Sequence, residues 1–281
     1  MTIQTALVQG AKLLEDEAIA APRLTAEVLL THALHRERSY LYAHPGEELS
    51  EIGWIHYGRY LHERLNGKPT QYITGRQEFY GREFCVTPDV LIPRPETEHL
   101  VEAAIARIRR GDLVVDVGTG SGAIAITLAL ETGARLLATD ISTAALRVAS
   151  ENARHLSASV ELVACDLLAC NLVDALRDRS IDVLVSNPPY VPQVDAPGLQ
   201  REVRDYEPHV ALFGGPTGLE SYQRLIADAP RVLRPGGWLL LELGYNSLDP
   251  VRAMLQRGWT DINVIPDLAG FPRVLAARLI W

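Results

Sequence analysis

Cysteine is scarce in this chain, and the scarcity excludes two classes of small protein. The 281 residues include 3 cysteines, Cys85, Cys165 and Cys170, and no two of them form a CxxC pair. Disulfide scaffolds and structural zinc sites need more cysteines at closer, regular spacing. We therefore expect neither a disulfide scaffold nor a metal site, and the sparse count suits a reducing cytoplasm.

A leader sequence and long apolar runs are also missing. The first residues, Met1 to Thr5, carry neither the basic start nor the apolar stretch of a signal peptide. No apolar run reaches the roughly 20 residues that a membrane-spanning helix needs. The sequence therefore predicts a cytoplasmic protein without membrane attachment, and we expect it to be a monomer.

Positive charge is in deficit. Lysine and arginine total 27 against 35 for aspartate and glutamate, so the formal net charge is -8 at pH 7. Proteins that hold duplex DNA present basic surfaces to its phosphate backbone, so we expect no stable nucleic-acid binding here. With 47% hydrophobic and 22% charged residues, the composition excludes a disordered or fibrous chain.

Residues 1–70 have the pattern of a small helical domain. Three apolar stripes recur at helical spacing, and the third begins after Ser50, a residue type that caps helix amino termini. Trp54 and Tyr57 belong to this third stripe and are expected in the core of the bundle. Residues 71–92 then mix aromatic and apolar side chains with polar ones around two glycines, which predicts a connecting β-hairpin.

Residues 93–281 are predicted to form an α/β domain. After a helix that begins within residues 92–98, apolar segments of strand length alternate with segments of helix length. This alternation predicts a mostly parallel sheet with helices on both faces. The last two strands have no helix between them and should pair antiparallel. The predicted strands are residues 113–117, 136–139, 160–163, 181–186, 238–243, 260–265 and 273–280.

A glycine-rich loop follows the first predicted strand, with the pattern Asp116-x-Gly118-x-Gly120-x-Gly122. Glycines permit a left-handed backbone and the close approach of a ligand, and the amides of the following helix favour electron-rich groups. The spacing differs from the dinucleotide fingerprint G-x-G-x-x-G, and no Walker lysine follows. It resembles the S-adenosylmethionine loop of class I methyltransferases. The candidate cofactor-binding residues of this loop are Gly118, Thr119, Gly120, Ser121 and Gly122.

Acidic residues follow the next two strands. An aspartate in the position of Asp140 can accept hydrogen bonds from ribose hydroxyls, as in dinucleotide folds. An acid after a strand is often a helix cap instead, but Ser142 can cap the next helix and leave Asp140 for a ligand. Asp166 and its neighbour Leu167 end the third strand and are further candidates for cofactor binding.

The tetrapeptide Asn187-Pro188-Pro189-Tyr190 follows the strand over residues 181–186, at the sheet edge where ligands bind. The amide oxygen of Asn187 and the carbonyl of Pro188 can each accept one hydrogen bond from a planar NH2 group, on which Tyr190 can stack. The set suits methyl transfer to an amide nitrogen, a weak nucleophile that must be oriented while positive charge develops. A proline-stiffened loop with Tyr190 as a packing residue, or a short polyproline ligand, is the alternative.

Together these motifs resemble amino-methyltransferases that act on planar NH2 groups, and more narrowly the release factor glutamine methyltransferases (the PrmC/HemK family). The resemblance covers nearly the whole chain, although residues 1–60 resemble the family only in being helical. It implies a Rossmann-like class I methyltransferase fold with a seven-stranded sheet and S-adenosyl-L-methionine as cofactor, with S-adenosyl-L-homocysteine as product. The segments that carry the narrower likeness are Gly67–Gly75, Ile92–Glu98, Glu207–Pro208 and Leu233–Gly237.

The resemblance also implies roles for single residues. The glycine loop and Asp140 would bind the cofactor, Asp166 would read the adenine amine, and Asn187 would touch both cofactor and substrate. Asn187 to Tyr190 would hold the glutamine of the Gly-Gly-Gln tip of a class 1 peptide chain release factor, which the domain over residues 1–70 would bind. One position departs from the family, because Leu167 stands where members carry an aromatic residue that covers adenine.

Three other functions fit part of the pattern. The tetrapeptide alone does not separate a release factor from a ribosomal protein as the source of the glutamine. Amino-methylation of adenine or cytosine in nucleic acid uses similar motifs, but the acidic balance weighs against it. A module that senses the cofactor without turnover would use the same glycine loop.

Overall fold

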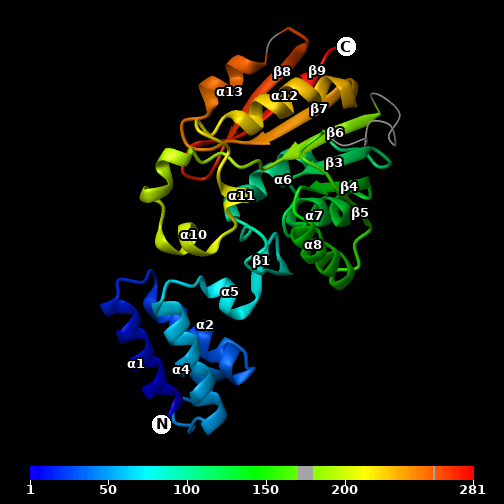
Figure 1. Ribbon diagram of the computed structural model, residues 1–281. Helices are drawn as coiled ribbons and strands as arrows, with labels where there is room; N and C mark the ends of the chain where they lie inside the picture. Colours follow the sequence, from blue (N-terminus) through cyan, green and yellow to red (C-terminus); the bar gives the residue numbers. More distant parts are fainter. Residues whose placement is uncertain (170–179, 256) are drawn as a thin grey trace. The chain divides into compact units, whose positions relative to one another are not determined.

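The computed structural model describes residues 1–169, 180–255 and 257–281. The chain divides into two compact units (Figure 1). Residues 1–76 and 200–206 form the helical unit, and residues 77–199 and 207–281 form the sheet unit.

The helical unit is a bundle of amphipathic helices, as predicted. Ser50 caps α4 by accepting a hydrogen bond from the Gly53 amide at 3.1 Å. Tyr57 is fully buried, and a Cβ at Gly10 would lie 2.0 Å from its hydroxyl, so glycine is required there. The helices are α1 (Ile3–Asp16), α2 (Pro22–Leu34), α3 (Arg38–Ala43), α4 (Glu51–Leu65), α5 (Thr70–Thr74) and α10 (Arg201–Tyr206).

One residue expected in the bundle core lies outside it. Trp54 is 40% exposed, whereas α4 buries Gly53, Tyr57 and Leu61. These three residues recur every four positions and face the core, while Trp54 is turned about 100° from Gly53 around the helix. The prediction for Trp54 is therefore wrong, because the buried stripe of α4 begins one residue earlier.

The predicted hairpin is present but shorter than residues 71–92, because residues 70–74 form the helix α5 instead. β1 (Arg76–Phe79) and β2 (Arg82–Cys85) form a separate two-stranded sheet, and Gly81 in the turn between them has φ 69°. Phe79 and Phe84 pack edge to face with ring centres 6.1 Å apart, and both are buried. A 3-10 turn, η1 (Pro95–Thr97), then leads into α6 (Glu98–Ile105), so the predicted helix in this region begins with a tighter turn.

The main sheet has seven strands in the order β5-β4-β3-β6-β7-β9-β8. All neighbouring pairs are parallel except those that involve β9. This strand runs antiparallel to β8, as predicted for the last two strands, and also antiparallel to β7. The strands are β3 (Leu113–Val117), β4 (Arg135–Asp140), β5 (Val160–Ala164), β6 (Ile181–Ser186), β7 (Leu233–Glu242), β8 (Trp259–Pro266) and β9 (Pro272–Leu279).

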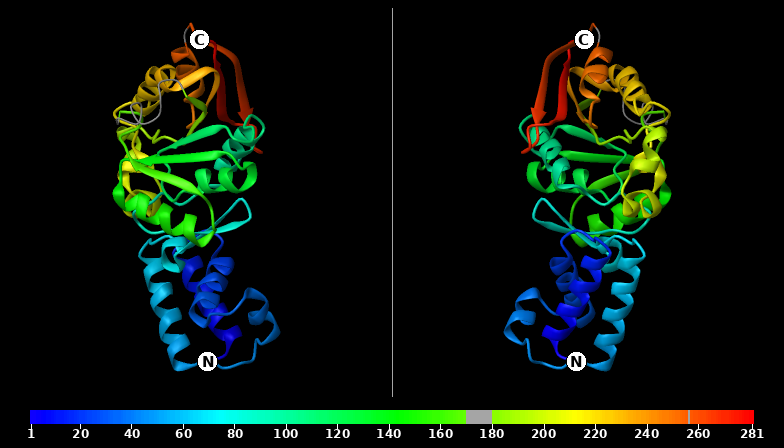
Figure 2. Two further views of the ribbon diagram at one scale, coloured as in Figure 1. Left: turned by 90° about the vertical axis from the view of Figure 1, so that its right-hand side faces the viewer. Right: turned by 90° about the vertical axis from the view of Figure 1, so that its left-hand side faces the viewer.

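Helices cover both faces of this sheet because successive strand residues point to opposite sides. Val115 of β3 packs in the same buried cluster as Tyr222 of α12, whereas Val114 packs with Leu100 of α6. Figure 2 shows α12 and α6 on opposite sides of the strands. Among the described residues, the helices of the sheet unit are α6, α7 (Ala123–Thr132), α8 (Thr143–His155), α11 (His209–Leu212), α12 (Glu220–Val232) and α13 (Leu248–Met254), with the 3-10 segment η2 (Gln193–Gly198).

The parallel pairing brings the carboxyl ends of β3, β4, β6 and β7 to one edge of the sheet. The glycine loop follows β3, Asp140 ends β4, Asn187 follows β6 and Glu242 ends β7. Residues that are far apart in the sequence therefore meet at this edge. Across the described residues, the structure contains no helix that is both long and apolar enough to cross a bilayer.

Candidate active site

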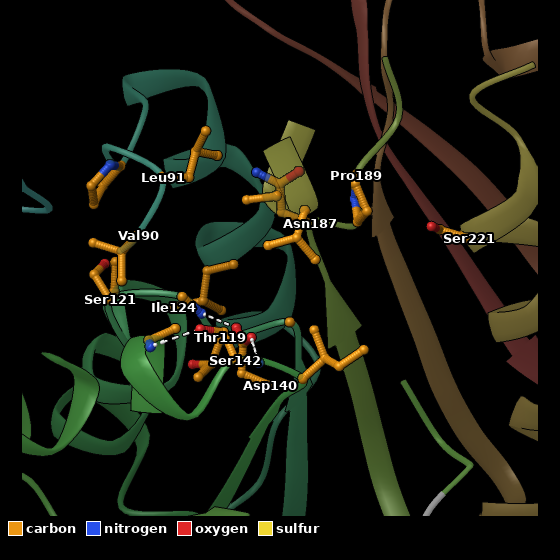
Figure 3. Close-up of a pocket in the computed structure, with 18 of the residues that line it drawn as sticks. Val90, Leu91, Thr119, Ser121, Ile124, Asp140, Ser142, Asn187, Pro189 and Ser221 are labelled. Atoms are coloured by element: carbon orange, nitrogen blue, oxygen red, sulfur yellow. Dashed lines mark hydrogen bonds between the residues drawn. The ribbon is translucent and has the colours of Figure 1, made fainter. Parts of the chain in front are cut away.

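A cavity of about 320 Å³ lies at the carboxyl edge of the sheet (Figure 3). It is lined by the glycine loop, by residues that follow β4, β5 and β6, and by the segment that precedes α6. Of the predicted cofactor residues, all except Gly122 line it. These residues are Gly118, Thr119, Gly120, Ser121, Asp140, Asp166, Leu167 and Asn187.

The glycines of the loop serve two different purposes. Gly118, Gly120 and Gly122 all have left-handed φ values, of 75°, 56° and 82°. A Cβ at Gly118 or Gly120 would meet no atom within 4 Å, so both backbones border open cavity space. A Cβ at Gly122, the cap of α7, would lie 2.8 Å from the Ile126 side chain in the first turn of that helix and 3.2 Å from Ala149 of α8. Two glycines thus leave room for a ligand, and the third permits packing.

The fully buried Asp116 holds the glycine loop in shape. Its Oδ2 accepts a hydrogen bond from the Thr119 hydroxyl at 2.6 Å and another from the Ala125 amide at 3.2 Å. These bonds tie the end of β3 to the middle of the loop and to the start of α7. Burial raises the pKa of Asp116 to about 7, and the two hydrogen bonds act in the opposite direction.

Asp140 lines the cavity. The sequence suggested that its carboxylate would be free of backbone partners, but two backbone amides bind it. Its Oδ2 accepts a hydrogen bond from the Gly120 amide at 2.9 Å, and its Oδ1 accepts one from the Ser142 amide at 2.8 Å. Ser142 caps α8 through the Ala145 amide, as predicted. Burial raises the pKa of Asp140, against the effect of these amides. Each carboxylate oxygen still has a second lone pair with which to accept a ligand hydroxyl.

The third-strand residues form the far side of the cavity. Asp166 is ion-paired with Arg224 at 2.8 Å, and both side chains are about half exposed. Leu167 has a left-handed backbone with φ 53°, an uncommon conformation for a leucine and one that is frequent at functional sites. Ile141 also lines the cavity and is 56% exposed. Sequence analysis missed Ile141, although an aliphatic residue directly after the strand-ending Asp140 was the available signal.

The tetrapeptide divides between the cavity and the interior. Asn187 and Pro189 line the cavity, while Pro188 and Tyr190 do not. The Nδ2 of Asn187 donates a hydrogen bond to the Thr97 hydroxyl at 3.2 Å, so its carbonyl oxygen stays available. Tyr190 is partly buried and packs where a Cβ on Gly244 would lie 2.6 Å from its ring. Tyr190 therefore packs against the interior, as the alternative interpretation of the tetrapeptide expected.

The segment before α6 contributes cavity residues that sequence analysis did not assign to the site. Thr97 is buried and binds Asn187, and Arg94 lines the cavity. Arg94 is ion-paired at 2.5 Å with Glu207, whose carboxyl is almost fully buried. This pair joins segments more than a hundred residues apart, so no local pattern could have identified it. Among the described residues, no group of three or more His, Cys, Asp or Glu side chains is arranged to hold a metal ion.

Two family models match the chain. The PrmC N-terminal domain matches residues 5–75, and the methyltransferase small domain matches residues 96–200. Among solved structures, the hMettl16 catalytic domain aligns with a TM-score of 0.56 at 22% identity, over 79% of this chain and 81% of its own. A methyltransferase from Pyrococcus furiosus aligns with a TM-score of 0.53 at 18% identity, over 72% and 90%. At these identities the likeness concerns the fold alone.

Curated relatives are similar over the full length. A release factor glutamine methyltransferase of Koribacter versatilis is 46% identical, over 99% of this chain and 99% of its own. Those of Moorella thermoacetica and Nitratidesulfovibrio vulgaris are 43% and 42% identical over 99% of this chain, and over 98% and 95% of theirs. With this identity across both units, the chain belongs to the release factor glutamine methyltransferase family.

Proposed function

We propose that this enzyme transfers a methyl group from S-adenosyl-L-methionine to the side-chain amide nitrogen of a glutamine. The glutamine is that of the Gly-Gly-Gln motif in class 1 peptide chain release factors. The observation that carries the proposal is the Asn187 side chain. It lines the cavity and its NH2 group is held by Thr97, so a carbonyl oxygen is available to a planar NH2 group. Family membership supplies the kind of substrate.

The cavity residues fit the proposed cofactor. Gly118 and Gly120 leave open space beside the backbone, which suits close approach by the methionine and ribose groups. Asp140 is oriented by two backbone amides and can accept a ribose hydroxyl. Ile141 and Leu167 offer apolar contacts for adenine from neighbouring strands, beside Asp166. When bound, the cofactor supplies a methyl carbon activated by the positive sulfur.

The residues after β6 are proposed to orient the acceptor amide. Asn187 Oδ1 and the Pro188 carbonyl would each accept one N–H bond of the substrate, so that the nitrogen lone pair faces the donor side of the cavity. Both oxygens would also stabilise the positive charge that develops on the nitrogen. Removing one such preorganised contact typically costs about 100- to 1,000-fold in rate. Tyr190 is proposed to stack on the planar amide. Its ring lies against Gly244, outside the residues that line the cavity, so this role and that of the Pro188 carbonyl require the glutamine side chain to reach past the cavity lining toward the interior.

The helical unit is proposed to bind the release factor. Within about one turn, α4 exposes Ile52, Trp54 and Ile55, at 68%, 40% and 58%. Neighbouring exposed apolar side chains often mark a protein-binding surface. Cytoplasmic location, a monomeric state and the lack of stable nucleic-acid binding remain predictions from the sequence.

Methyl transfer to defined acceptors tests this proposal. The purified enzyme would be given S-adenosylmethionine with a labelled methyl group and, separately, a recombinant class 1 release factor, ribosomal proteins or a DNA duplex. We expect label only in the release factor, and none after its Gly-Gly-Gln glutamine is replaced by alanine. Label in a ribosomal protein or in DNA instead would reject the proposal. Cofactor binding without label in any acceptor would favour a sensor.

A further inference from the structure

An arginine on the wall of the cavity has no role in the account above. Arg94 lies in the segment before α6 and lines the cavity. Thr97, three residues further on, binds Asn187. Figure 3 shows Leu91, from the same segment, and Asn187 at the end of the cavity away from Asp140. The segment that carries Arg94 therefore borders the proposed acceptor site and not the proposed ribose site.

A buried carboxylate holds the guanidinium of Arg94. The Arg94 Nη2 donates a hydrogen bond to Glu207 Oε1 at 2.5 Å, and the Glu207 side chain is 1% exposed. Charge-assisted hydrogen bonds of this kind are strong, and removing one partner of a buried pair leaves an uncompensated charge. Glu207 precedes α11, of which Val210 and Ala211 line the same cavity. The pair thus fixes Arg94 between two segments of the cavity wall.

The guanidinium has more hydrogen-bond donors than this pair uses. It carries five N–H donors in a planar fork and has no acceptor. Across the part of the chain that the structure describes, Arg94 has no hydrogen-bond partner other than Glu207. Its side chain is 34% exposed, so the remaining donors can reach a ligand in the cavity. The ligand groups that suit them are oxygen acceptors.

We propose that Arg94 is a specificity-determining residue, which binds the backbone carbonyl oxygens of the glycines next to the acceptor glutamine. Glycine has no side chain to shield its peptide group, so a Gly-Gly segment lets a planar guanidinium approach its carbonyls closely. The inference rests on the proposed function, because it assigns a partner to the Gly-Gly part of the motif. The residues proposed to hold the glutamine leave that part without one.

The charge of Arg94 predicts an effect on substrate binding and not on the chemical step. Positive charge develops on the acceptor nitrogen during methyl transfer, and a guanidinium cannot stabilise positive charge. A carbonyl contact that is equally strong in the ground state and the transition state lowers KM without raising kcat. Loss of the planar fork should therefore raise KM for the release factor and leave kcat nearly unchanged.

Steady-state kinetics of two variants test this split. Arg94→Lys keeps the charge and loses the fork, whereas Arg94→Met combined with Glu207→Gln removes both charges, so that no buried carboxylate is left alone. Each should raise KM for the release factor about tenfold or more, with kcat within about threefold. The matched control is Arg234→Lys, because Arg234 is half exposed and ion-paired with Asp182 but lies outside the cavity. It should leave KM unchanged.

Peptide binding provides a readout that needs no turnover and that a purely structural role would not move. The probes are a synthetic Gly-Gly-Gln peptide and two versions in which sulfur replaces one glycine carbonyl oxygen. Sulfur is the weaker acceptor, so one thioamide should bind the unmodified enzyme about fivefold more weakly in calorimetry, and Arg94→Lys less than about twofold more weakly. If Arg94 only supported the fold, both enzymes would lose the same factor.

Each outcome decides one of the two proposals. An unchanged KM in both Arg94 variants, or equal thioamide losses in the two enzymes, would overturn the role of Arg94. So would a raised Kd for S-adenosylmethionine with an unchanged KM for the release factor, because Arg94 would then bind the cofactor carboxylate. If the unmodified enzyme methylates no release factor, the proposed function fails and calorimetry with the peptides still decides the role of Arg94. If the double variant does not fold or the peptides do not bind, KM of Arg94→Lys decides it.

Discussion

Alanine substitutions in the glycine loop should separate stability from cofactor binding. Gly120→Ala places a Cβ in open cavity space, and its left-handed φ of 56° costs about 1–2 kcal/mol of folding free energy. Gly122→Ala has the same backbone cost. It also forces its Cβ to 2.8 Å from Ile126, and such overpacking costs a further ~1–3 kcal/mol. We therefore expect Gly122→Ala to lose about 2–5 kcal/mol, and Gly120→Ala clearly less.

Cofactor affinity should rank these variants in the opposite order of severity. The new methyl group of Gly120→Ala occupies space that the proposed cofactor needs, so the Kd for S-adenosylmethionine should rise at least about tenfold, or about 1.4 kcal/mol. Gly133→Ala is the matched control, because Gly133 has φ 63° and open space around it but lies at the end of α7, outside the cavity. It should lose stability like Gly120→Ala and keep its affinity.

Urea denaturation and isothermal titration calorimetry measure the two quantities. The calorimetry uses whichever variants remain folded at the assay temperature. The reasoning is refuted if Gly122→Ala is as stable as Gly133→Ala, or if Gly120→Ala binds S-adenosylmethionine as tightly as the unmodified protein.

Three further predictions concern the acidic and amide groups of the edge. Asp140→Asn should weaken S-adenosylmethionine binding about tenfold in calorimetry, with a smaller change in melting temperature; equal affinity would contradict the ribose role. Asn187→Ala should lower kcat about 100- to 1,000-fold in the methyl-transfer assay, and an unchanged kcat would remove it from the acceptor site. Native Glu242 keeps a proton that the unfolded chain releases between pH 4.5 and about 7. The unmodified protein should therefore lose stability relative to Glu242→Gln as pH rises through this window, by up to ~1.4 kcal/mol per pH unit in urea titrations; a constant difference would refute the raised pKa.

Features set by neighbouring residues could be predicted from the sequence. The strand and helix alternation led to the mostly parallel sheet, and the missing helix between the last two strands led to their antiparallel pairing. Ser50 and Ser142 cap the helices predicted for them, because a cap depends on residues two or three positions away. The position of the motifs directly after strands also predicted that the candidate residues would lie together, since the carboxyl ends of parallel strands share an edge. Most of them line one cavity.

Contacts between distant segments could not be predicted in this way. Thr97 binds Asn187 across 90 residues, and Glu242 meets Tyr190 across 52, so neither partnership leaves a local pattern. Asp140 was expected to be free because Ser142 caps the next helix. In the fold, however, the glycine loop places the Gly120 amide within hydrogen-bond distance of the Asp140 carboxylate. The exposure of Trp54 depends on which face of α4 packs against its neighbours. An apolar stripe read from the sequence with an ambiguity of one residue does not decide that face.

The most direct test of the central claim is to locate the transferred methyl group. Fragmentation mass spectrometry of a class 1 release factor, incubated with this enzyme and S-adenosylmethionine, identifies the modified atom group in the Gly-Gly-Gln peptide. The account predicts one added methyl group on the glutamine side chain, and its loss with Asn187→Ala. A methyl group on another residue, or an unmodified peptide despite cofactor binding, would contradict it.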